Sequence, residues 1–298
     1  MKLGLNLVRA RPDHMPEFAA HAEALGYESV FVPDHVVFPV EFESKYPGSA
    51  DGTFPYPRDT PLFDPWTMLT AIGRATSTIR LGTAVYVLAL RHPIITARET
   101  VSLEHYVGGR LILGVGVGWL AEEFDALGIK PRSRFSRAEE AAAALRCLWT
   151  EPKPSFHGKH FSFDEVYLEP KPRSSPHPPI LFGGDSDPAM RRALRYGDGW
   201  MSGGVANDVE EVASALQRLA TARDLLDKEG DDVFESDRPF DVTVLEPSPT
   251  AHDLERMAEL GVNRVVIMPW ERNRDAPAVI ERFMAMARDV VEVEASRA

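Results

Sequence analysis

Three glycines alternate with valines in the stretch RLILGVGVGWLAEEFDALG, residues 110–128. A dinucleotide-binding loop reads G-x-G-x-x-G, whereas this stretch reads G-x-G-x-G-W and does not match. Alternating glycines clear the Cβ atoms from one face of a strand end, where a flat ring system can lie against bare backbone. The other interpretation of Gly114, Gly116 and Gly118 is that they ease crowding inside a barrel. Three glycines leading into Trp119 favour the ligand interpretation.

A second glycine pair precedes a predicted helix in GGDSDPAMRRA, residues 183–193. The N–H groups and the dipole at a helix N-terminus form a natural site for a phosphate. The same residues also fit a tight turn followed by an ordinary N-cap at Asp185 or Ser186. The motif alone leaves both interpretations open.

The predicted strand ends lack the side chains that most catalytic classes need. They offer no lysine for a Schiff base, no facing carboxylate pair for a glycosidase and no histidine–carboxylate cluster for a metal-dependent hydrolase. The chain also has no G-x-S-x-G motif. We therefore expect no metal site, and we expect a bound cofactor to carry out the difficult chemical step.

Short apolar runs alternate with amphipathic segments along the chain, the pattern of repeated β-α units. The predicted strands are residues 2–8, 29–35, 79–88, 110–116, 179–184, 198–204, 240–245 and 264–269. The predicted helices are residues 12–25, 64–76, 92–107, 118–150 (broken near Pro131), 187–196, 207–228, 250–260 and 275–295. We therefore predict a single (β/α)8 TIM barrel over residues 1–298. A β-hairpin at 156–170 would lie in an insertion of about residues 151–178, between strands four and five. Active sites of this fold lie at the C-terminal ends of the strands.

The composition limits the possible partners. The 298 residues carry a net charge of −12, which disfavours nucleic acid as a partner. No apolar N-terminal leader and no run long enough to span a bilayer is present, so secretion and membrane insertion are not expected. The single Cys147 excludes an internal disulfide framework and fits a reducing compartment. We expect a cytoplasmic enzyme with a small-molecule substrate.

An ordered set of motifs resembles the luciferase-like monooxygenase superfamily. The set consists of PDH (33–35), RHPIITARETVSLEHYVGGRLILGVGVGWLAEEFDALG (91–128), R-x-x-R (134–137), LWT (148–150), FHGKHFSF (156–163), PPILFGGDS (178–186) and RRALRYGDGW (191–200). Within the superfamily, the sequence is most similar to oxidoreductases that depend on the deazaflavin coenzyme F420. The resemblance runs from Lys2 to Trp200.

This resemblance implies a luciferase-like barrel that binds coenzyme F420, or alternatively FMN, across its strand ends. It implies a phosphate at the loop after strand five and a ring that leans on a bulge with a non-proline cis peptide at Ala84–Val85. It also makes His35 the catalytic residue that moves a proton near the ring. The implied cofactor-binding residues are Asp34, His35, Ala84, Val85, Gly116, Gly118, Trp119, Gly183, Gly184, Asp185 and Ser186.

Departures from the family pattern bear on the mechanism and on the phosphate site. Trp119 stands where some sugar-phosphate dehydrogenases of the superfamily carry a catalytic glutamate, so we do not transfer their mechanism. Glu122 and Glu123 follow one turn later, and we interpret them as solvated helix charges. Asp185 would repel a phosphate unless it points away or is offset by Arg191 or Arg192.

We expect an oxidoreductase that transfers hydride between coenzyme F420 and a small organic substrate. The alternatives are an FMNH2-dependent monooxygenase served by a separate flavin reductase and, more distantly, a barrel that binds flavin without turnover. Asn6, Phe38, Trp119 and Trp270 are the expected substrate pocket, and the long loop 36–63 is expected to close over it as a lid. The resemblance also implies a homodimer and a reductase that supplies reduced cofactor.

Overall fold

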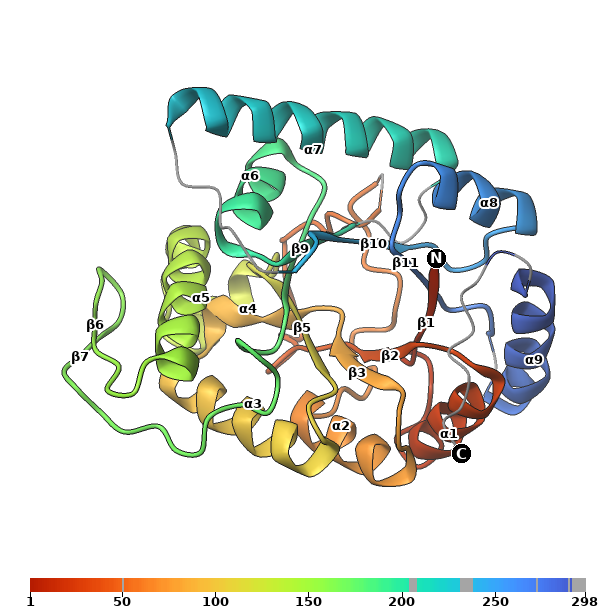
Figure 1. Cartoon of the computed structure of the whole chain (residues 1–298), viewed down its shortest axis with the longest axis horizontal. Helices are drawn as coiled ribbons and strands as arrows, with labels where there is room; N and C mark the ends of the chain where they lie inside the picture. The colour runs from red at the N-terminus through yellow and green to blue at the C-terminus, as the bar shows by residue number, and fades with distance from the viewer. Residues whose placement is uncertain (50, 204–207, 231–237, 272, 289, 291–298) are drawn as a thin grey trace.

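The computed structural model describes residues 1–49, 51–203, 208–230, 238–271, 273–288 and 290, and its parallel strands close into a barrel (Figure 1). The strand order is β3-β2-β1-β11-β10-β9-β8-β5-β4, and a further β3–β5 pairing closes the ring. The strands are β1 (Lys2–Asn6), β2 (Ser29–Val32), β3 (Arg80–Thr83), β4 (Tyr86–Val87), β5 (Leu111–Gly116), β8 (Ile180–Gly183), β9 (Gly199–Met201), β10 (Asp241–Leu245) and β11 (Arg264–Ile267). Because β3 and β4 both pair with β5, they are two parts of the strand predicted at 79–88. The predicted eight-stranded barrel is confirmed.

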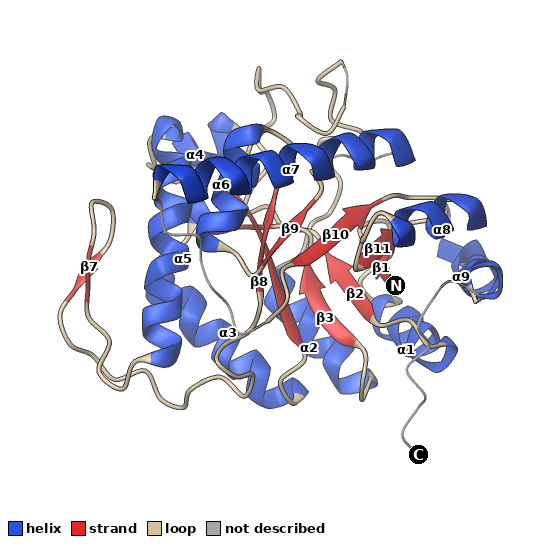
Figure 2. Cartoon of the chain, turned by 45° about the horizontal axis from the view of Figure 1, so that its top comes forward, coloured by secondary structure: helices blue, strands red, loops and turns tan. Residues whose placement is uncertain are grey.

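Helices surround the barrel on its outside (Figure 2). They are α1 (Met15–Leu25), α2 (Pro65–Ala75), α3 (Pro93–Val107), α4 (Ala121–Ala126), α5 (Arg134–Thr150), α6 (Asp187–Tyr196), α7 (Val209–Glu229), α8 (Ala251–Glu259) and α9 (Ala276–Ala287). The predicted break near Pro131 is confirmed, because a 3-10 turn at Pro131–Ser133 separates α4 from α5. The predicted helix at 275–295 is described only as far as Ala287, and most of its remainder lies outside the described residues. No helix within the described part of the chain is long and apolar enough to cross a membrane.

The predicted hairpin between barrel strands four and five is confirmed. It consists of β6 (Phe156–His157) and β7 (Ser162–Phe163), which pair antiparallel and project from the side of α5 (Figures 1 and 2). The carboxylate of Glu140 on α5 fixes the hairpin by accepting the backbone N–H groups of Lys159 and His160, at 2.9 and 2.7 Å. The paired part is shorter than the predicted 156–170, because the chain is irregular from 164 to 179.

The barrel interior is filled by side chains. A buried layer consists of Phe31, Ile112, Leu181, Met201 and Val266. The ring of Phe31 needs a glycine on the neighbouring strand, since a Cβ at Gly82 would lie 2.4 Å from Phe31 Cε1. This packed layer forms a closed floor beneath the strand C-termini.

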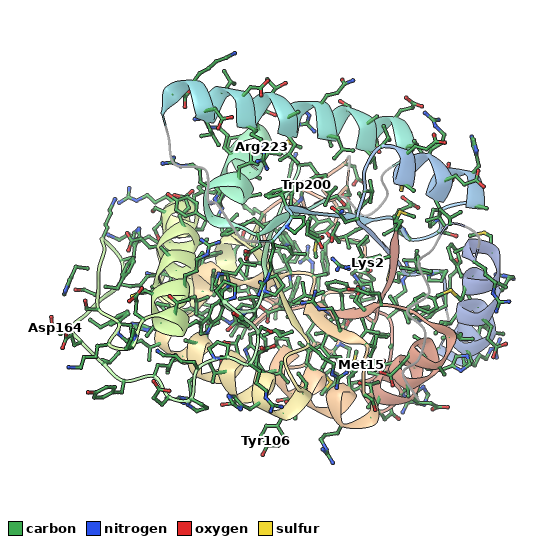
Figure 3. The ribbon with its side chains drawn as sticks, viewed as in Figure 1. Lys2, Met15, Tyr106, Asp164, Trp200 and Arg223 are labelled. Carbon is green, nitrogen blue, oxygen red and sulfur yellow. The ribbon has the colours of Figure 1, made fainter. Side chains whose placement is uncertain are left out.

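An ionic network closes the opposite end of the barrel. Arg264, at the start of β11, is fully buried and donates to the carboxylates of Glu28 and Asp241 at 2.9 and 3.0 Å. Lys2, at the start of β1, lies 3.8 Å from Glu28 and is labelled in Figure 3. These groups lie at strand N-termini, so they are separated from the strand C-termini by the packed interior.

Candidate active site at the barrel mouth

A cavity of about 620 Å³ opens at the C-terminal ends of the barrel strands. This volume falls within the range of roughly 300–1,000 Å³ that is typical of small-molecule sites. Its walls include residues from the ends of most of the strands: Asn6, Pro33, Asp34, Ala84, Val85, Val117, Gly118, Gly183, Gly184, Ser202, Leu245 and Met268. The fold therefore places this cavity where TIM barrels hold their active sites.

A bulge at Ala84 and Val85 forms part of the cavity floor. Its peptide bond is cis, which confirms the bond that the family resemblance implied. Both side chains pack on the buried interior layer of the barrel together with Leu245. The bulge therefore rests on the core and faces the cavity at the same time.

Gly114 and Gly116 make room for this bulge. A Cβ at Gly114 would lie 2.0 Å from the carbonyl oxygen of Thr83, and a Cβ at Gly116 would lie 2.6 Å from Val85 Cγ2. The expectation that Gly116 contacts the cofactor ring is therefore corrected: it faces Val85, and Val85 faces the cavity. Gly118, with a φ of +80°, does line the cavity.

Asp34 fastens the bulge to the barrel. Its carboxylate accepts the backbone N–H of Val87 at 2.8 Å and the Nη2 of Arg91 at 2.6 Å. Burial raises the pKa of Asp34, and the guanidinium of Arg91 opposes that shift. Asp34 lines the cavity as predicted, but its oxygens are engaged in holding β4 and the turn that precedes α3. Its observed contacts are therefore those of a positioning residue.

His35 follows β2 and lines the cavity, with a carboxylate behind it. Its Nδ1 lies 2.9 Å from Glu123 Oε2, and Glu123 Oε1 accepts the backbone N–H of Val36 at 2.6 Å. The side chain of Glu123 is 0 % exposed. Because the carboxylate accepts, Nδ1 of His35 donates, and Nε2 is the nitrogen that remains for a ligand.

The interpretation of Glu123 as a solvated helix charge is therefore wrong. One signal in the sequence could have revealed its role. Glu123 lies in the first turn of the helix that follows a barrel strand, and side chains there reach the barrel mouth. The partner lies on a strand end 88 positions earlier in the chain. No local pattern records such a long-range contact.

Glu122 holds the loop 36–63 to the start of α4. Its Oε1 accepts the backbone N–H groups of Glu43 and Ser44, at 2.7 and 3.2 Å, and Ser44 Oγ in turn accepts the N–H of Ala121. Burial opposes ionisation, but the hydrogen bonds from Ser44 and Glu43 outweigh it and lower the pKa of Glu122 to about 2. Glu122, interpreted from the sequence as a solvated helix charge, is instead half-buried and engaged by the loop.

The loop 36–63 brings aromatic rings to the cavity around Trp119. Phe54 stacks on the Trp119 indole with ring centroids 5.5 Å apart, and Tyr46 meets the indole edge-on at 5.3 Å. The loop residues predicted to form a lid that do line the cavity are Phe38, Tyr46, Phe54 and Tyr56. Phe42 contacts the Trp119 ring at 5.7 Å without being part of the wall.

The loop after β8 provides a polar wall. Gly184 has a φ of +124°, and Ser186 is the N-cap of α6, where its hydroxyl accepts the N–H of Ala189 at 3.3 Å. Asp185 Oδ1 accepts the N–H of Gly203 at 2.8 Å. This bond ties the carboxylate to the end of β9.

Two arginines line the cavity beside this loop. Arg192 of α6 is buried, and its Nε donates to Glu139 at 3.0 Å. Its guanidinium and that of Arg134 both lie over the ring of Phe135, at 5.3 and 4.4 Å. Arg134 was visible in the sequence only as part of the R-x-x-R motif. Arg191, in contrast, pairs with Glu229 of α7 and is not part of the wall.

Three of the four predicted substrate-pocket residues line the cavity: Asn6, Phe38 and Trp119. Trp270 does not, and that prediction is corrected. Its ring is 1 % exposed and packs edge-on against Phe18 of α1, with centroids 6.2 Å apart. The chain turns towards the outer core after β11, so Met268 is the residue that reaches the cavity there.

Among the described residues, no group of three or more His, Cys, Asp or Glu side chains could hold a metal ion.

Comparison with known proteins gives a consistent assignment. A family model described as luciferase-like monooxygenase matches residues 3–240. An uncharacterised protein of Mycobacterium tuberculosis is 32% identical over 290 residues, which cover 96% of this chain and 98% of that protein.

Two named relatives match over shorter stretches. An F420-dependent glucose-6-phosphate dehydrogenase of Nakamurella multipartita is 30% identical over 195 residues, 64% of this chain and 52% of the relative. An FMNH2-dependent dimethylsulfone monooxygenase of Pseudomonas putida is 36% identical over 130 residues, 43% of this chain and 35% of the relative.

Solved structures share the fold. An F420-dependent secondary alcohol dehydrogenase in complex with an F420–acetone adduct superimposes with a TM-score of 0.74 at 19% identity, over 98% of this chain and 99% of that one. The monooxygenase RslO1 from Streptomyces bottropensis gives a TM-score of 0.73 at 19% identity, over 97% and 99%. The chain is therefore an enzyme that belongs to the luciferase-like monooxygenase family.

Proposed function

We propose that this protein is a coenzyme F420-dependent oxidoreductase that moves a hydride between the deazaflavin and a small organic substrate. The observation that carries the proposal is the pairing of His35 with the buried Glu123 in the cavity wall. A hydride exchange with an alcohol or a carbonyl compound also requires a proton to be moved. A histidine fixed by a carboxylate is suited to that task.

The cavity walls fit such a cofactor. The floor at Ala84 and Val85 offers an apolar surface for a flat ring. At the polar wall, Gly184 leaves backbone accessible and α6 presents its N-terminus, with Arg192 beside it. These groups favour an anion. We therefore propose that the ring lies over the bulge and that the phosphate lies at Ser186.

The protein supplies the proton in this scheme. Coenzyme F420, when bound, would supply a ring able to accept or return a hydride. As a C–H bond of an alcohol substrate breaks to release that hydride, Nε2 of His35 takes the hydroxyl proton, and the carbonyl C=O forms. In the reverse direction the imidazolium returns the proton to the carbonyl oxygen. Glu123 keeps Nδ1 protonated and the ring oriented throughout.

Relatives support both the proposal and a second candidate. The F420-dependent relative matches a larger share of this chain, whereas the FMNH2-dependent monooxygenase matches a shorter stretch at higher identity. The second candidate is thus an FMNH2-dependent monooxygenase. A barrel that binds flavin without turnover is a more distant one.

The test is a fluorescence titration of the purified apo-protein with coenzyme F420 and, separately, with FMN. We expect micromolar binding of F420 and weaker binding of FMN. The reverse order, with oxygen consumption in the presence of FMN and a flavin reductase, would establish the monooxygenase. Binding without turnover of any alcohol or carbonyl compound would favour the non-catalytic barrel. If neither cofactor bound, the proposal would fail.

We further propose that residues 1–298 form one domain and that the protein is a homodimer served by a separate reductase. Helix α3 offers support for a dimer contact, because it exposes Ile95 and Tyr106, 55% and 69% accessible. Tyr106 points away from the barrel in Figure 3. Sedimentation of the protein and of an Ile95→Glu variant tests the contact, since a dimer through α3 would dissociate in the variant.

A further inference from the structure

We propose that the substrate is a neutral, largely apolar molecule with a planar or cyclic body, bound at the aromatic end of the cavity. The aromatic end is defined by five residues: Phe38, Tyr46, Phe54, Tyr56 and Trp119. This inference rests on the proposed function for the reaction that follows binding. The preference for an apolar ligand is a property of the walls themselves.

The rings of the aromatic end pack on one another. Phe38 packs on Phe54 with centroids 4.9 Å apart, and Phe54 in turn stacks on Trp119. Tyr56 meets Phe54 at 5.5 Å, and the Tyr56 hydroxyl contacts the sulfur of Met268. Rings that support one another lose little conformational freedom when a ligand arrives, so the area that they bury is converted efficiently into affinity.

The loop that carries these rings is fixed at two places on α4. Glu122 accepts the N–H groups of Glu43 and Ser44, and Glu123 accepts those of Val36 and Val37. Both carboxylates thus belong to the turn that follows Trp119. The loop and the indole are held to the same short helix, so the rings of the aromatic end keep their positions relative to one another.

Charged side chains near the aromatic end are already neutralised or extend into solvent. Arg58 is exposed, pairs with Glu41 at 2.8 Å and lies over the Phe42 ring at 4.4 Å. Lys45 is an exposed residue of the rim. Arg134 and Arg192 lie together on Phe135, in the part of the cavity assigned to the phosphate. A charged substrate group buried among the rings would lose its hydration without gaining a partner.

A cationic substrate is also disfavoured, although aromatic rings can bind cations. The Trp119 face is covered by Phe54, at an interplanar angle of 26°. His35 also lines the cavity and contacts these rings, 4.8 Å from Phe38 and 6.0 Å from Trp119 between ring centroids. A neutral ketone or alcohol with an apolar body satisfies both the rings and the histidine.

The experiment is calorimetric titration with cyclohexanone, acetophenone and 2-acetylnaphthalene, and with glucose 6-phosphate as the charged counterpart. Each titration is made with apo-protein and with protein loaded with F420. Because each successive ketone presents more apolar area to the rings, we expect the Kd to fall on the order of tenfold per step along the series. Glucose 6-phosphate is expected to show no saturable binding to the loaded protein, in which the phosphate site is taken.

Matched variants of one loop locate the ketone site. Phe54→Ala removes a ring of the aromatic end and should weaken 2-acetylnaphthalene binding at least tenfold, with F420 affinity unchanged. Phe63→Ala is the control, because Phe63 belongs to the same loop, is 44% exposed and does not line the cavity. It should change neither affinity.

The outcomes separate this inference from the proposed function. Any of four results would overturn the apolar site. They are an absence of ketone binding, equal Kd values along the ketone series, tighter binding of glucose 6-phosphate than of the ketones to the loaded protein, and equal effects of the two variants. If neither F420 nor FMN bound while the ketone series still depended on Phe54, the apolar site would stand and the proposed function would fail. If F420 bound and the ketones did not, only the apolar site would fail.

Discussion

At the residue scale, the pairing of Glu123 with His35 is the feature with the clearest consequence. A fully buried carboxylate is costly unless every lone pair finds a donor, and here the imidazole and backbone N–H groups provide them. In Glu123→Gln the amide cannot accept from all of these donors, so His35 loses its fixed tautomer. We expect kcat with a ketone substrate and reduced F420 to fall on the order of 10²-fold, with little change in F420 affinity. Nitrogen-15 NMR of the His35 ring should show mixed tautomers.

A matched variant controls for the loss of hydrogen bonds alone. Glu23 also accepts several backbone N–H groups, from Ser77, Thr78 and Ile79, but it lies on α1 at the opposite end of the barrel. Glu23→Gln should lower stability and leave kcat and the His35 tautomer intact. Equal losses of kcat in the two variants would show that Glu123 acts only through the stability of the fold.

Asp34 leads to a prediction about stability at the same scale. Its carboxylate is fully buried against Arg91, whose side chain is 17% exposed. Asp34→Asn leaves the guanidinium without its counter-charge, so the free energy of unfolding should fall by about 3–5 kcal/mol in urea. The surface pair Arg11–Asp13 provides the control, because both side chains are largely exposed and Asp13→Asn should have no measurable effect. A loss of less than about 1 kcal/mol for Asp34→Asn would contradict the structural role assigned to this pair.

At the element scale, the bulge between β3 and β4 depends on the glycines of β5. A Cβ at Gly116 would lie 2.6 Å from Val85 Cγ2, and a valine at that short distance cannot swing aside as a long side chain does. Gly116→Ala should therefore displace Val85, weaken F420 binding and cost about 1–3 kcal/mol of stability. The double variant Gly116→Ala/Val85→Ala removes the clashing methyl group and should recover most of the lost stability. If the double variant were as impaired as the single one, the clash would not be the cause.

The elements themselves could be predicted from the sequence, because hydrophobic periodicity, proline and capping residues are local signals. The break at Pro131 and the N-cap at Ser186 are examples that the structure confirms. The relation of Glu123 to His35 and the position of Trp270 could not be predicted, because they depend on how distant strand ends meet. Gly116 shows an intermediate case: its need for a small side chain was visible in the sequence, but its neighbour was not.

At the scale of the whole molecule, the packed barrel interior separates two ends with different chemistry. The C-terminal end carries the cavity, the histidine and the aromatic loop. The N-terminal end carries the network of Arg264, Glu28 and Asp241. In TIM barrels the first end supports activity and the second supports stability. Substitutions at the network should therefore change folding without changing the affinity for cofactor.

Glu28 allows this separation to be tested through pH. Burial opposes its ionisation, but the charges of Arg264 and Arg80 outweigh burial and lower the pKa of Glu28 to about 2. Because this value lies below the ordinary 4.5, the ionised group contributes stability that is complete above pH 4.5 and is lost as the pH falls towards 2. Glu28→Gln should lower the free energy of unfolding at pH 7 by about 3–5 kcal/mol, since Arg264 loses a buried partner. The free energy of unfolding, measured by urea denaturation at each pH, should also fall less between pH 5 and pH 3.5 in the variant than in the unchanged protein. The folded variant should bind F420 with an unchanged Kd. An unchanged slope in this pH range, or a loss of F420 affinity by the folded variant, would show that the two ends are not independent.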